Sequence, residues 1–210
     1  MAIFMMSQIV QAQYDDANSH IGISGGYSYM NILTDNFKVT PLGGFNVGFS
    51  TRGMFYDYFD LVYGMEFFQT SVAMEGYRLG SGKSEQLVFM NKGVQVHLLG
   101  SYRAISDHLN FDFGPVFQLN DKLTVKDAQQ EYILEGTPLK AADVADVSKF
   151  NVLLGAGVTG GSMHVRASLF YQYGLTNFFS KLNKTEPVSN AGYNLKGNLS
   201  LLTARVIFYL

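Results

Sequence analysis

The residues of this chain that could carry out chemistry are few and widely spaced. His164 and Ser168 are the residue types of a Ser–His hydrolase, but four positions along a strand separate them by ~13 Å, too far for a hydrogen bond. Asp143 and Asp146 offer oxygen ligands for Ca²⁺ without the dense ligand spacing of an EF-hand loop. There is no cysteine, which excludes a thiol nucleophile and a thiolate metal site. We therefore predict no catalytic residue, no metal site and no cofactor.

A second group of ionisable residues alternates along the chain with apolar neighbours. The group consists of Glu66, His97, Asp112, His164, Arg166 and Arg205. Successive side chains of a strand point to opposite faces, so we expect all six inside a barrel, as a lumen charge network. Isolated buried charges are costly, so Arg166 and Arg205 should pair with carboxylates, for which Glu66 and Asp112 are the candidates.

This charge network has two interpretations. It could line a gated pore or a proton path, or it could be a structural plug that fills a narrow interior. We favour the plug, because a barrel of eight strands is only just wide enough inside for its own side chains.

The alternation that carries this argument recurs in eight segments. From Met163 to Leu175, one parity holds apolar residues such as Val165 and Leu169, and the other holds mostly polar ones such as Arg166 and Gln172. The eight segments lie within 21–29, 44–50, 60–68, 94–99, 109–119, 150–159, 163–175 and 202–210. An even number of strands lets the last run antiparallel to the first and close the sheet. The pattern predicts an all-β, eight-stranded antiparallel up-and-down transmembrane β-barrel.

The connections between these segments alternate in length. Segments 53–58, 103–107 and 160–162 are short, whereas 31–40, 75–86, 121–148 and 176–196 are longer and more polar. Outer-membrane barrels combine short periplasmic turns with long external loops in this way. The pattern therefore predicts the outer membrane as the location.

A soluble up-and-down barrel, such as a lipocalin, is the structural alternative. It would need an outer face rich in Lys and Glu, but here the non-apolar parity carries mainly Gly, Ser, Asn and Gln. Inward glycines instead make room for bulky Phe68, Leu153, Phe170 and Tyr209. Lys92 shares the apolar parity but lies toward the loop end of its strand, where it can reach the headgroups.

Aromatic residues mark the two expected membrane interfaces. Tyr27, Tyr29, Tyr171 and Tyr173 fall at the loop ends of their strands. Phe55, Tyr56, Tyr58, Tyr102 and Phe208 fall at the turn ends. Two such girdles are typical of a membrane barrel.

Composition and the first residues define the class and the domain. A formal net charge of −2 gives no basic excess, so nucleic acid is not an expected partner. No stretch reaches the ~18 consecutive apolar residues of a transmembrane helix. Residues 1–12 are interpreted as a signal peptide with cleavage after Ala12, and its true start could lie upstream because no basic segment precedes its apolar run. Residues 13–210 then form a single barrel domain.

Several short motifs resemble the PorT-like outer-membrane barrel family of Bacteroidota, whose members are small barrels of the OmpA type. They are Gly22-Ile23-Ser24-Gly25-Gly26-Tyr27, Gly43-Gly44-Phe45-Asn46-Val47-Gly48-Phe49, Met65-Glu66-Phe67-Phe68-Gln69-Thr70-Ser71, Phe111-Asp112-Phe113-Gly114-Pro115, Gly155-Ala156-Gly157 and Tyr171-Gln172-Tyr173-Gly174-Leu175-Thr176-Asn177. Their order and spacing extend over nearly the whole mature chain. Two features depart from the family: Val94-Gln95-Val96 replaces an Ile-Pro step, and the last residue is Leu210 rather than an aromatic.

The resemblance implies a non-enzymatic accessory or scaffold subunit of an envelope secretion or assembly complex. Its partners would be outer-membrane lipid or lipopolysaccharide and other envelope proteins. Two alternatives stay open: a lipid-modifying enzyme of the outer leaflet, and a small pore. An enzyme needs a polar cluster within hydrogen-bond reach near one rim, and a pore needs a continuous water path past Arg166 and Arg205.

Overall fold

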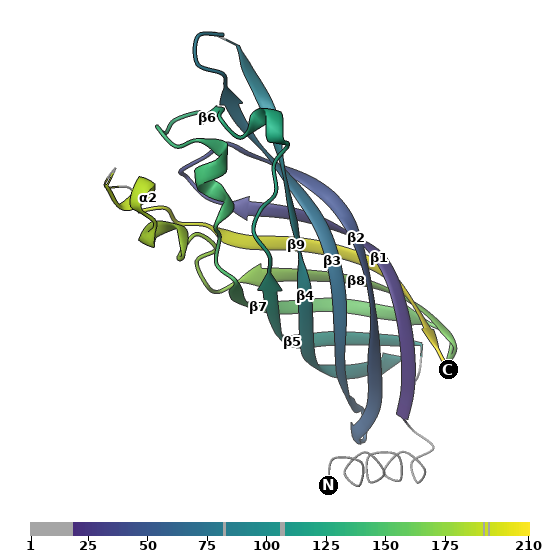
Figure 1. Ribbon diagram of the computed structural model, residues 1–210. Helices are drawn as coiled ribbons and strands as arrows, with labels where there is room; N and C mark the ends of the chain where they lie inside the picture. Colours follow the sequence, from purple (N-terminus) through teal and green to yellow (C-terminus); the bar gives the residue numbers. More distant parts are fainter. Residues whose placement is uncertain (1–18, 82, 106–107, 191, 193) are drawn as a thin grey trace, which may run out of the picture.

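The computed structural model describes residues 19–81, 83–105, 108–190, 192 and 194–210, so the predicted signal peptide lies outside the described residues. Eight long antiparallel strands form the body of the molecule (Figure 1). They are β1 (Ser19–Leu33), β2 (Val39–Tyr56), β3 (Phe59–Tyr77), β4 (Ser84–Ile105), β5 (Leu109–Asn120), β7 (Phe150–Gly161), β8 (Val165–Gly174) and β9 (Asn198–Tyr209).

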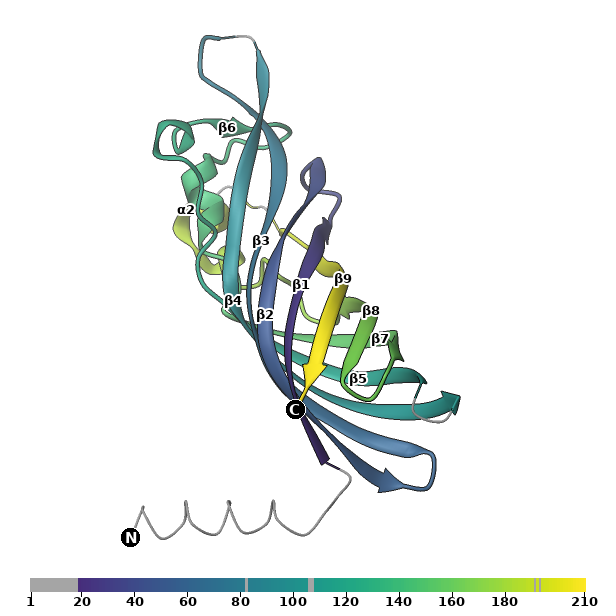
Figure 2. The same cartoon turned by 90° about the vertical axis from the view of Figure 1, so that its right-hand side faces the viewer.

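The sheet closes on itself. The strands are hydrogen-bonded in the order β2-β1-β9-β8-β7-β5-β4-β3, and β2 also pairs with β3. At the seam between the first and last strands, Ile23 lies opposite Phe208 and Leu33 opposite Asn198. Figure 2 shows β1 and β9 side by side at this seam. Closure leaves no unpaired barrel edge in the membrane, where unsatisfied backbone groups are very costly, and it confirms the predicted eight-stranded barrel.

A ninth strand, β6 (Ile133–Leu134), lies within the β5–β7 connection and pairs with Gly76 and Tyr77 of β3. This connection leaves β5, beside β4, and crosses to the far edge of β3, so it covers one mouth of the barrel. It also holds the 3-10 helices η1 (Asp127–Gln129) and η2 (Ala141–Ala145). The β8–β9 connection holds η3 (Leu182–Lys184) and α2 (Glu186–Asn190). None of the helices among the described residues has the length and apolarity to cross a membrane.

Several of the predicted connections are wrong in extent. Instead of 31–40, 53–58 and 75–86, the connections lie only between Leu33 and Val39, between Tyr56 and Phe59, and between Tyr77 and Ser84. Strands β3 and β4 have 19 and 22 residues, whereas a membrane-spanning strand needs about 9–11. Their outer ends therefore project beyond the membrane as a paired hairpin. In these outer ends the apolar residues occupy the inward positions, whereas in the spanning part they occupy the outward positions. Because the alternation changes there, the sequence pattern predicts loops.

The two faces of the barrel have opposite character. Outward residues are large, apolar and exposed, for example Phe45, Phe67, Phe113 and Leu169. Inward residues are buried and mostly polar, with Gly155 and Gly157 facing Phe170. A Cβ on Gly155 would lie 2.3 Å from the Phe170 ring, so this glycine makes room for the bulky neighbour. The exterior therefore suits hydrocarbon, and the aromatic residues predicted for the two girdles are exposed at the strand ends.

The faces exchange character at one level of the wall. Along β3, outward Phe67 is followed by outward Gln69, while inward Thr70 is followed by inward Val72. Along β4, Lys92 lies directly opposite Gln69, and inward Asn91 gives way to inward Phe89 and Leu87. The change marks the upper membrane boundary, above which the outside is water and the inside is an apolar core.

Candidate functional site: the filled interior

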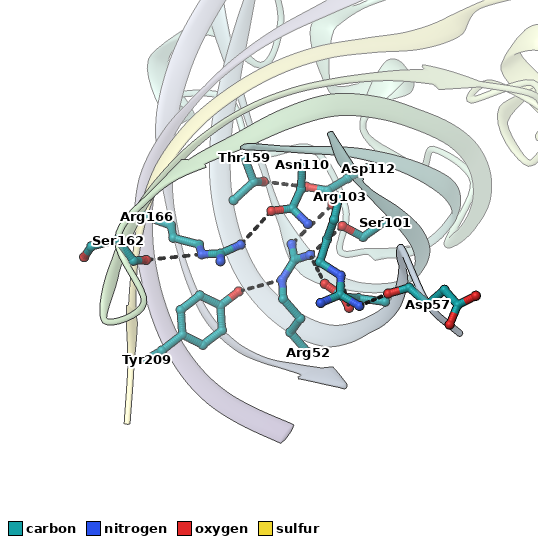
Figure 3. A network of polar contacts seen from close by, with 11 residues as sticks. Arg52, Asp57, Ser101, Arg103, Asn110, Asp112, Thr159, Ser162, Arg166 and Tyr209 are labelled. Carbon is teal, nitrogen blue, oxygen red and sulfur yellow. Dashed lines mark hydrogen bonds and ion pairs between the residues drawn. The ribbon is translucent and has the colours of Figure 1, made fainter. Parts of the chain in front are cut away.

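Arg52 lies at the centre of a polar cluster near the turn end of the barrel (Figure 3). Its guanidinium contacts two carboxylates, with Nη1 at 3.2 Å from Asp60 Oδ2 and Nη2 at 3.2 Å from Asp112 Oδ1. Nη1 also donates to Ser101, and Nε lies 3.5 Å from the Tyr209 hydroxyl. One planar group from β2 thus connects β3, β4, β5 and β9 across the interior, a role that suits the fixed fork of an arginine.

Two further arginines extend this cluster. Arg103 Nε lies 3.3 Å from Asp60 Oδ1, and its Nη2 donates to the carbonyl of Asp57 in the β2–β3 turn. Arg166 Nη1 donates to Asn110 Oδ1 at 2.8 Å, and its Nε donates to the Ser162 carbonyl at 3.3 Å. These contacts bind the turns to the barrel wall.

A further ion pair lies deeper in the lumen. Arg205 Nη1 contacts Glu66 Oε1, and Asn46 Nδ2 donates to the other carboxylate oxygen at 3.0 Å. His97 Nδ1 lies 4.0 Å from Glu66, and the Arg205 guanidinium stands 5.3 Å from the centre of the Phe170 ring. Each charge is therefore compensated by an opposite charge, an amide or a ring face, as desolvated groups require.

The structure places five of the six predicted network residues inside and corrects one. Glu66, His97, Asp112, Arg166 and Arg205 are buried. His164 is exposed, because β8 begins only at Val165 and His164 belongs to the turn before it.

The pairing within the network also differs from the expectation. The parity argument named Asp112 as a candidate partner for Arg166, but Arg52 occupies Oδ1 of Asp112 and Thr159 donates to Oδ2. Sequence reasoning missed Arg52 because it ended the second strand at Ser50. The signal was present: Arg52 continues the inward parity of Gly48 and Ser50, and β2 runs on to Tyr56.

Above the charged clusters lies a layer of amides. Gln95 donates to Gln118 at 2.6 Å, Gln118 donates to Asn120 at 2.5 Å, and Asn91 donates to the same Asn120 oxygen at 3.1 Å. Gln172 reaches Gln95 at 3.4 Å from the opposite wall. These neutral side chains hydrogen-bond to one another across the lumen, although Asn91 Oδ1 and Gln172 Oε1 are buried without a hydrogen-bond partner.

An apolar core closes the mouth above the amides. We call it the loop cap core; it is formed by inward residues of the projecting strands and by both long connections. Its fully buried members include Ile32, Val72, Met74, Leu87, Phe89, Leu134, Leu139, Val144, Phe178, Phe179, Leu182, Val188, Leu195 and Leu199. Packing of this kind excludes water from the mouth.

The described residues enclose a small cavity in the charged region. A cavity of about 20 Å³ lies among Arg52, His97, Asp112, Arg205 and Tyr209. Such a volume holds about one water molecule and no substrate. The polar interior is therefore suited to bracing the strands against one another.

The residues considered for chemistry do not come together. Ser168 is buried in the lumen, whereas His164 is exposed in the turn. Asp143 accepts the backbone N–H of Lys140 at 2.9 Å, and Asp146 lies 2.6 Å from Lys181 Nζ. Across the described residues, no group of three His, Asp or Glu side chains could hold a metal ion.

Comparison with known proteins gives a likeness of fold. No protein-family model matches the chain, and no curated protein matches it by sequence. Among solved structures, Ail of Yersinia pestis in complex with the heparin analogue sucrose octasulfate is 16% identical, with a TM-score of 0.53 over 92% of this chain and 99% of that one. The outer membrane protein OprG of Pseudomonas aeruginosa is 12% identical, with a TM-score of 0.47 over 92% and 96%.

The fold and its two faces together decide the class. A closed antiparallel barrel with an apolar exposed wall and a polar filled interior is stable in a bilayer, and the short turns and long connections follow the outer-membrane pattern. This chain is an integral outer-membrane β-barrel. By that pattern, we expect the mouth covered by the loop cap core to face the outside of the cell and the turns that carry Asp57 and Ser162 to face the periplasm.

Proposed function

We propose that this barrel is a non-enzymatic, non-conducting accessory or scaffold subunit of an envelope secretion or assembly complex, and that it belongs to the PorT-like barrels of Bacteroidota. One observation carries the non-conducting part of the proposal: among the described residues, side chains occupy the interior at three successive levels. Arginine–carboxylate pairs occupy the periplasmic half, amides occupy the middle, and the loop cap core closes the outer mouth.

This filling argues against a pore. The water-sized cavity near Arg52 lies beneath the amide layer of Gln95 and Gln118, and above that layer Phe89 and Leu87 are fully buried. An ion would have to separate paired charges and then cross a dry apolar core, and each step carries a desolvation cost.

The outer end supports a scaffolding role. Mobile loops would pay a large ordering entropy on binding, whereas a cap with its own buried core presents a fixed surface. The cap surface is also tied down by ion pairs: Lys181 and Lys122 contact Asp146, and Lys140 contacts Glu131 at 2.5 Å. We infer that partners contact this surface or the lipid-facing wall.

Export is part of the proposal. Residues 1–12 would act as the signal peptide and residues 13–210 would form the mature barrel. Protein isolated from outer membranes should begin at Gln13, as read by N-terminal sequencing. A mature N-terminus that still holds residues 1–12 would contradict this assignment.

The decisive experiment has two readouts. In planar bilayers, the purified protein should give no steady ion current, and a stable open channel would overturn the plug. In mild-detergent purification from native outer membranes, wild-type protein should retain a stoichiometric envelope protein. A variant whose loop cap is opened, Leu87→Ala, should lose that protein, while the matched surface variant Val88→Ala should keep it. Wild-type barrels that always purify alone would contradict the accessory role.

A further inference from the structure

One edge of the projecting β3–β4 hairpin has no neighbouring strand. On the β3 side, β2 and β6 pair with the strand out to its last residue, Tyr77. On the β4 side, the chain that follows β5 stays beside β4 only as far as Thr124, which exchanges two backbone hydrogen bonds with Met90, at 2.8 and 2.9 Å. Beyond Met90, no described residue pairs with this side of residues 84–89, which we call the free edge. Figure 1 shows the hairpin projecting above the rest of the molecule.

The backbone of the free edge offers a row of hydrogen-bonding groups. The N–H and the C=O of Met90 both face Thr124. Because this orientation repeats at every second residue of a strand, Val88, Gln86 and Ser84 direct their N–H and C=O groups to the same side. None of these groups forms a backbone hydrogen bond with any residue that the structure describes. Such a row of alternating donors and acceptors is complementary to the backbone of an extended polypeptide.

The free edge is held in its extended conformation by the rest of the cap. Leu87 and Phe89, which alternate with the edge residues, are fully buried in the loop cap core. Pairing with β3 continues without a register shift to Ser84, whose hydroxyl also donates to Glu135 at 3.2 Å. A partner strand would therefore bind to an edge that is already ordered, which lowers the entropic cost of binding.

The devices that normally protect an exposed strand edge are missing from residues 84–89. Natural proteins blunt such edges with lysine, proline, a bulge or a covering segment. This stretch holds no lysine and no proline, and the β3–β4 ladder has no bulge along its length. The side chains of Gln86 and Val88 are exposed, and the single charge of the stretch is the exposed Glu85. The free edge is thus open to pairing with another chain.

We propose that the free edge binds an extended segment of another protein, which adds to β4 as an antiparallel strand beyond Thr124. Antiparallel pairing places the N–H and C=O groups of the partner opposite those of Gln86 and Val88. Glu85 directs its own backbone groups to β3, so it forms a non-hydrogen-bonded pair with the partner, in which the two side chains lie close together. The partner therefore carries a basic residue opposite Glu85. The proposal rests on the fold alone and holds without any secretion complex.

A second copy of this chain does not fit the free edge. Two barrels in one membrane stand side by side with their hairpins pointing the same way, so their free edges would meet in parallel. A twofold axis along the membrane normal then places Gln86 of each copy at the same height, with N–H facing N–H and C=O facing C=O. Hydrogen bonds cannot form in that arrangement, so the occupant is a different polypeptide.

The test uses the full-length protein in lipid nanodiscs and a fluorescent peptide that alternates threonine and valine, with one lysine placed opposite Glu85. We expect saturable binding of one peptide, measured by fluorescence anisotropy. Methylation of the peptide nitrogens that face β4 should weaken binding by about tenfold, equivalent to ~1.4 kcal/mol, whereas methylation of the alternate nitrogens should not. Failure of the parent peptide to bind, or equal losses in the two methylated peptides, would overturn the proposal.

Two variants of the protein locate the bound peptide. Gln86→Pro removes an N–H of the free edge and none that bonds to β3, and it should weaken binding by about tenfold. Glu85→Lys should weaken binding of the lysine peptide by a similar factor and restore it for a peptide with glutamate at that position. Glu186→Lys, the same charge change on α2, is the control and should bind as wild type. Heat-modifiable gel mobility confirms that every variant is folded, and equal binding by all of them would contradict the site.

Hydrogen exchange gives a readout that does not depend on variants. Without peptide, the amides of Gln86 and Val88 should exchange fast and those of Leu87 and Phe89 slowly, and saturation with peptide should slow the first pair. Unchanged exchange of Gln86 and Val88 at saturation would place the peptide elsewhere and overturn the proposal. Protection of these two amides without peptide, in a protein that cross-links as a dimer, would assign the free edge to a second copy and overturn it as well.

Discussion

The two ends of the β3–β4 hairpin place their apolar side chains on opposite faces of the sheet. In the membrane, the hairpin turns Asp60, Glu66 and His97 inward and apolar residues outward. Beyond Gln69 and Lys92, the same inward positions hold apolar residues such as Met74 and Leu87. The backbone pairing continues unchanged from Phe59–Tyr102 to Tyr77–Ser84.

The difference shows that the surrounding medium, and not the strand itself, decides whether the inward or the outward positions carry apolar side chains. In hydrocarbon the outer face must be apolar, so the interior is left for polar groups that satisfy one another. In water the apolar side chains gain by turning inward. Four predictions test this contrast between lumen and cap, from the largest expected effect to the smallest.

The largest effect is expected from the buried ion pair in the membrane half. Glu66→Ala should lower barrel stability by about 3–5 kcal/mol, because Arg205 is then buried without its carboxylate. The double variant Glu66→Ala with Arg205→Ala should cost less than the sum of the losses of Glu66→Ala and Arg205→Ala. The measurement is a double-mutant cycle read by heat-modifiable gel mobility in urea. Additive losses would show that the two charges are solvated independently and that the lumen holds water.

The cap should respond to loss of an apolar side chain instead. Leu87→Ala removes a fully buried side chain of the loop cap core and should cost about 2–5 kcal/mol. The expected result is faster proteolysis of the 121–149 connection while the barrel keeps its heat-modifiable mobility. Val88→Ala, at an exposed position of the same strand, is the control and should leave cleavage unchanged. Unfolding of the barrel together with the cap would show that the two regions are one cooperative unit.

A charged side chain should destabilise the barrel when it is placed on the lipid-facing wall but not when it is placed on the cap surface. Leu169→Arg places a cation in the hydrocarbon zone and should cost about 2–4 kcal/mol of barrel stability. Ala142→Arg, at an exposed cap position, should cost nothing measurable. Folding into lipid vesicles, followed by gel mobility, measures both. Equal stability of the two variants would contradict the assignment of the outer face of the barrel to lipid.

The smallest effect is expected from an exposed ion pair of the cap. Lys38 Nζ lies 2.7 Å from Glu75 Oε1, and this hydrogen bond lowers the pKa of Glu75 and raises the pKa of Lys38. A lowered carboxyl pKa stabilises the fold above the unfolded value of 4.5, and this stabilisation is lost as the pH falls through the folded pKa. The raised pKa of Lys38 acts on the alkaline side, so its contribution is complete below 10.5 and is lost as the pH rises through the folded pKa.

Lys38→Met should therefore loosen the cap slightly at neutral pH and not at all once Glu75 is protonated. Hydrogen exchange of segment 34–38, compared between variant and wild type at each pH, measures the difference. The solvent-exposed lysine keeps the effect small. If the difference in hydrogen exchange persisted unchanged in acid, its cause would be the lost packing of the lysine side-chain stem and not the ion pair.

Much of the wall was predictable because it depends on local alternation. Segments such as 109–119 and 150–159 lie within β5 and β7, and the seam joins the first and last strands as an even count requires. The charge network of the interior was less predictable from the sequence. Parity identified Glu66 and Arg205 as inward-facing but gave no distance between strands β3 and β9, which are far apart in sequence. It could not assign Asp112 to Arg52, because that choice depends on where side chains from different strands meet in the lumen.

The sequence by itself determined the spanning strands, their two faces and the closed antiparallel topology, since a period of two and an apolar outer parity are local properties that only a bilayer-embedded barrel satisfies. The tertiary structure decided which charges pair, where the strands leave the membrane, and that the long connections share one apolar core. It also left one edge of β4 without a neighbouring strand. Those features depend on contacts between residues remote in sequence, and only the closed sheet fixes the distances between them.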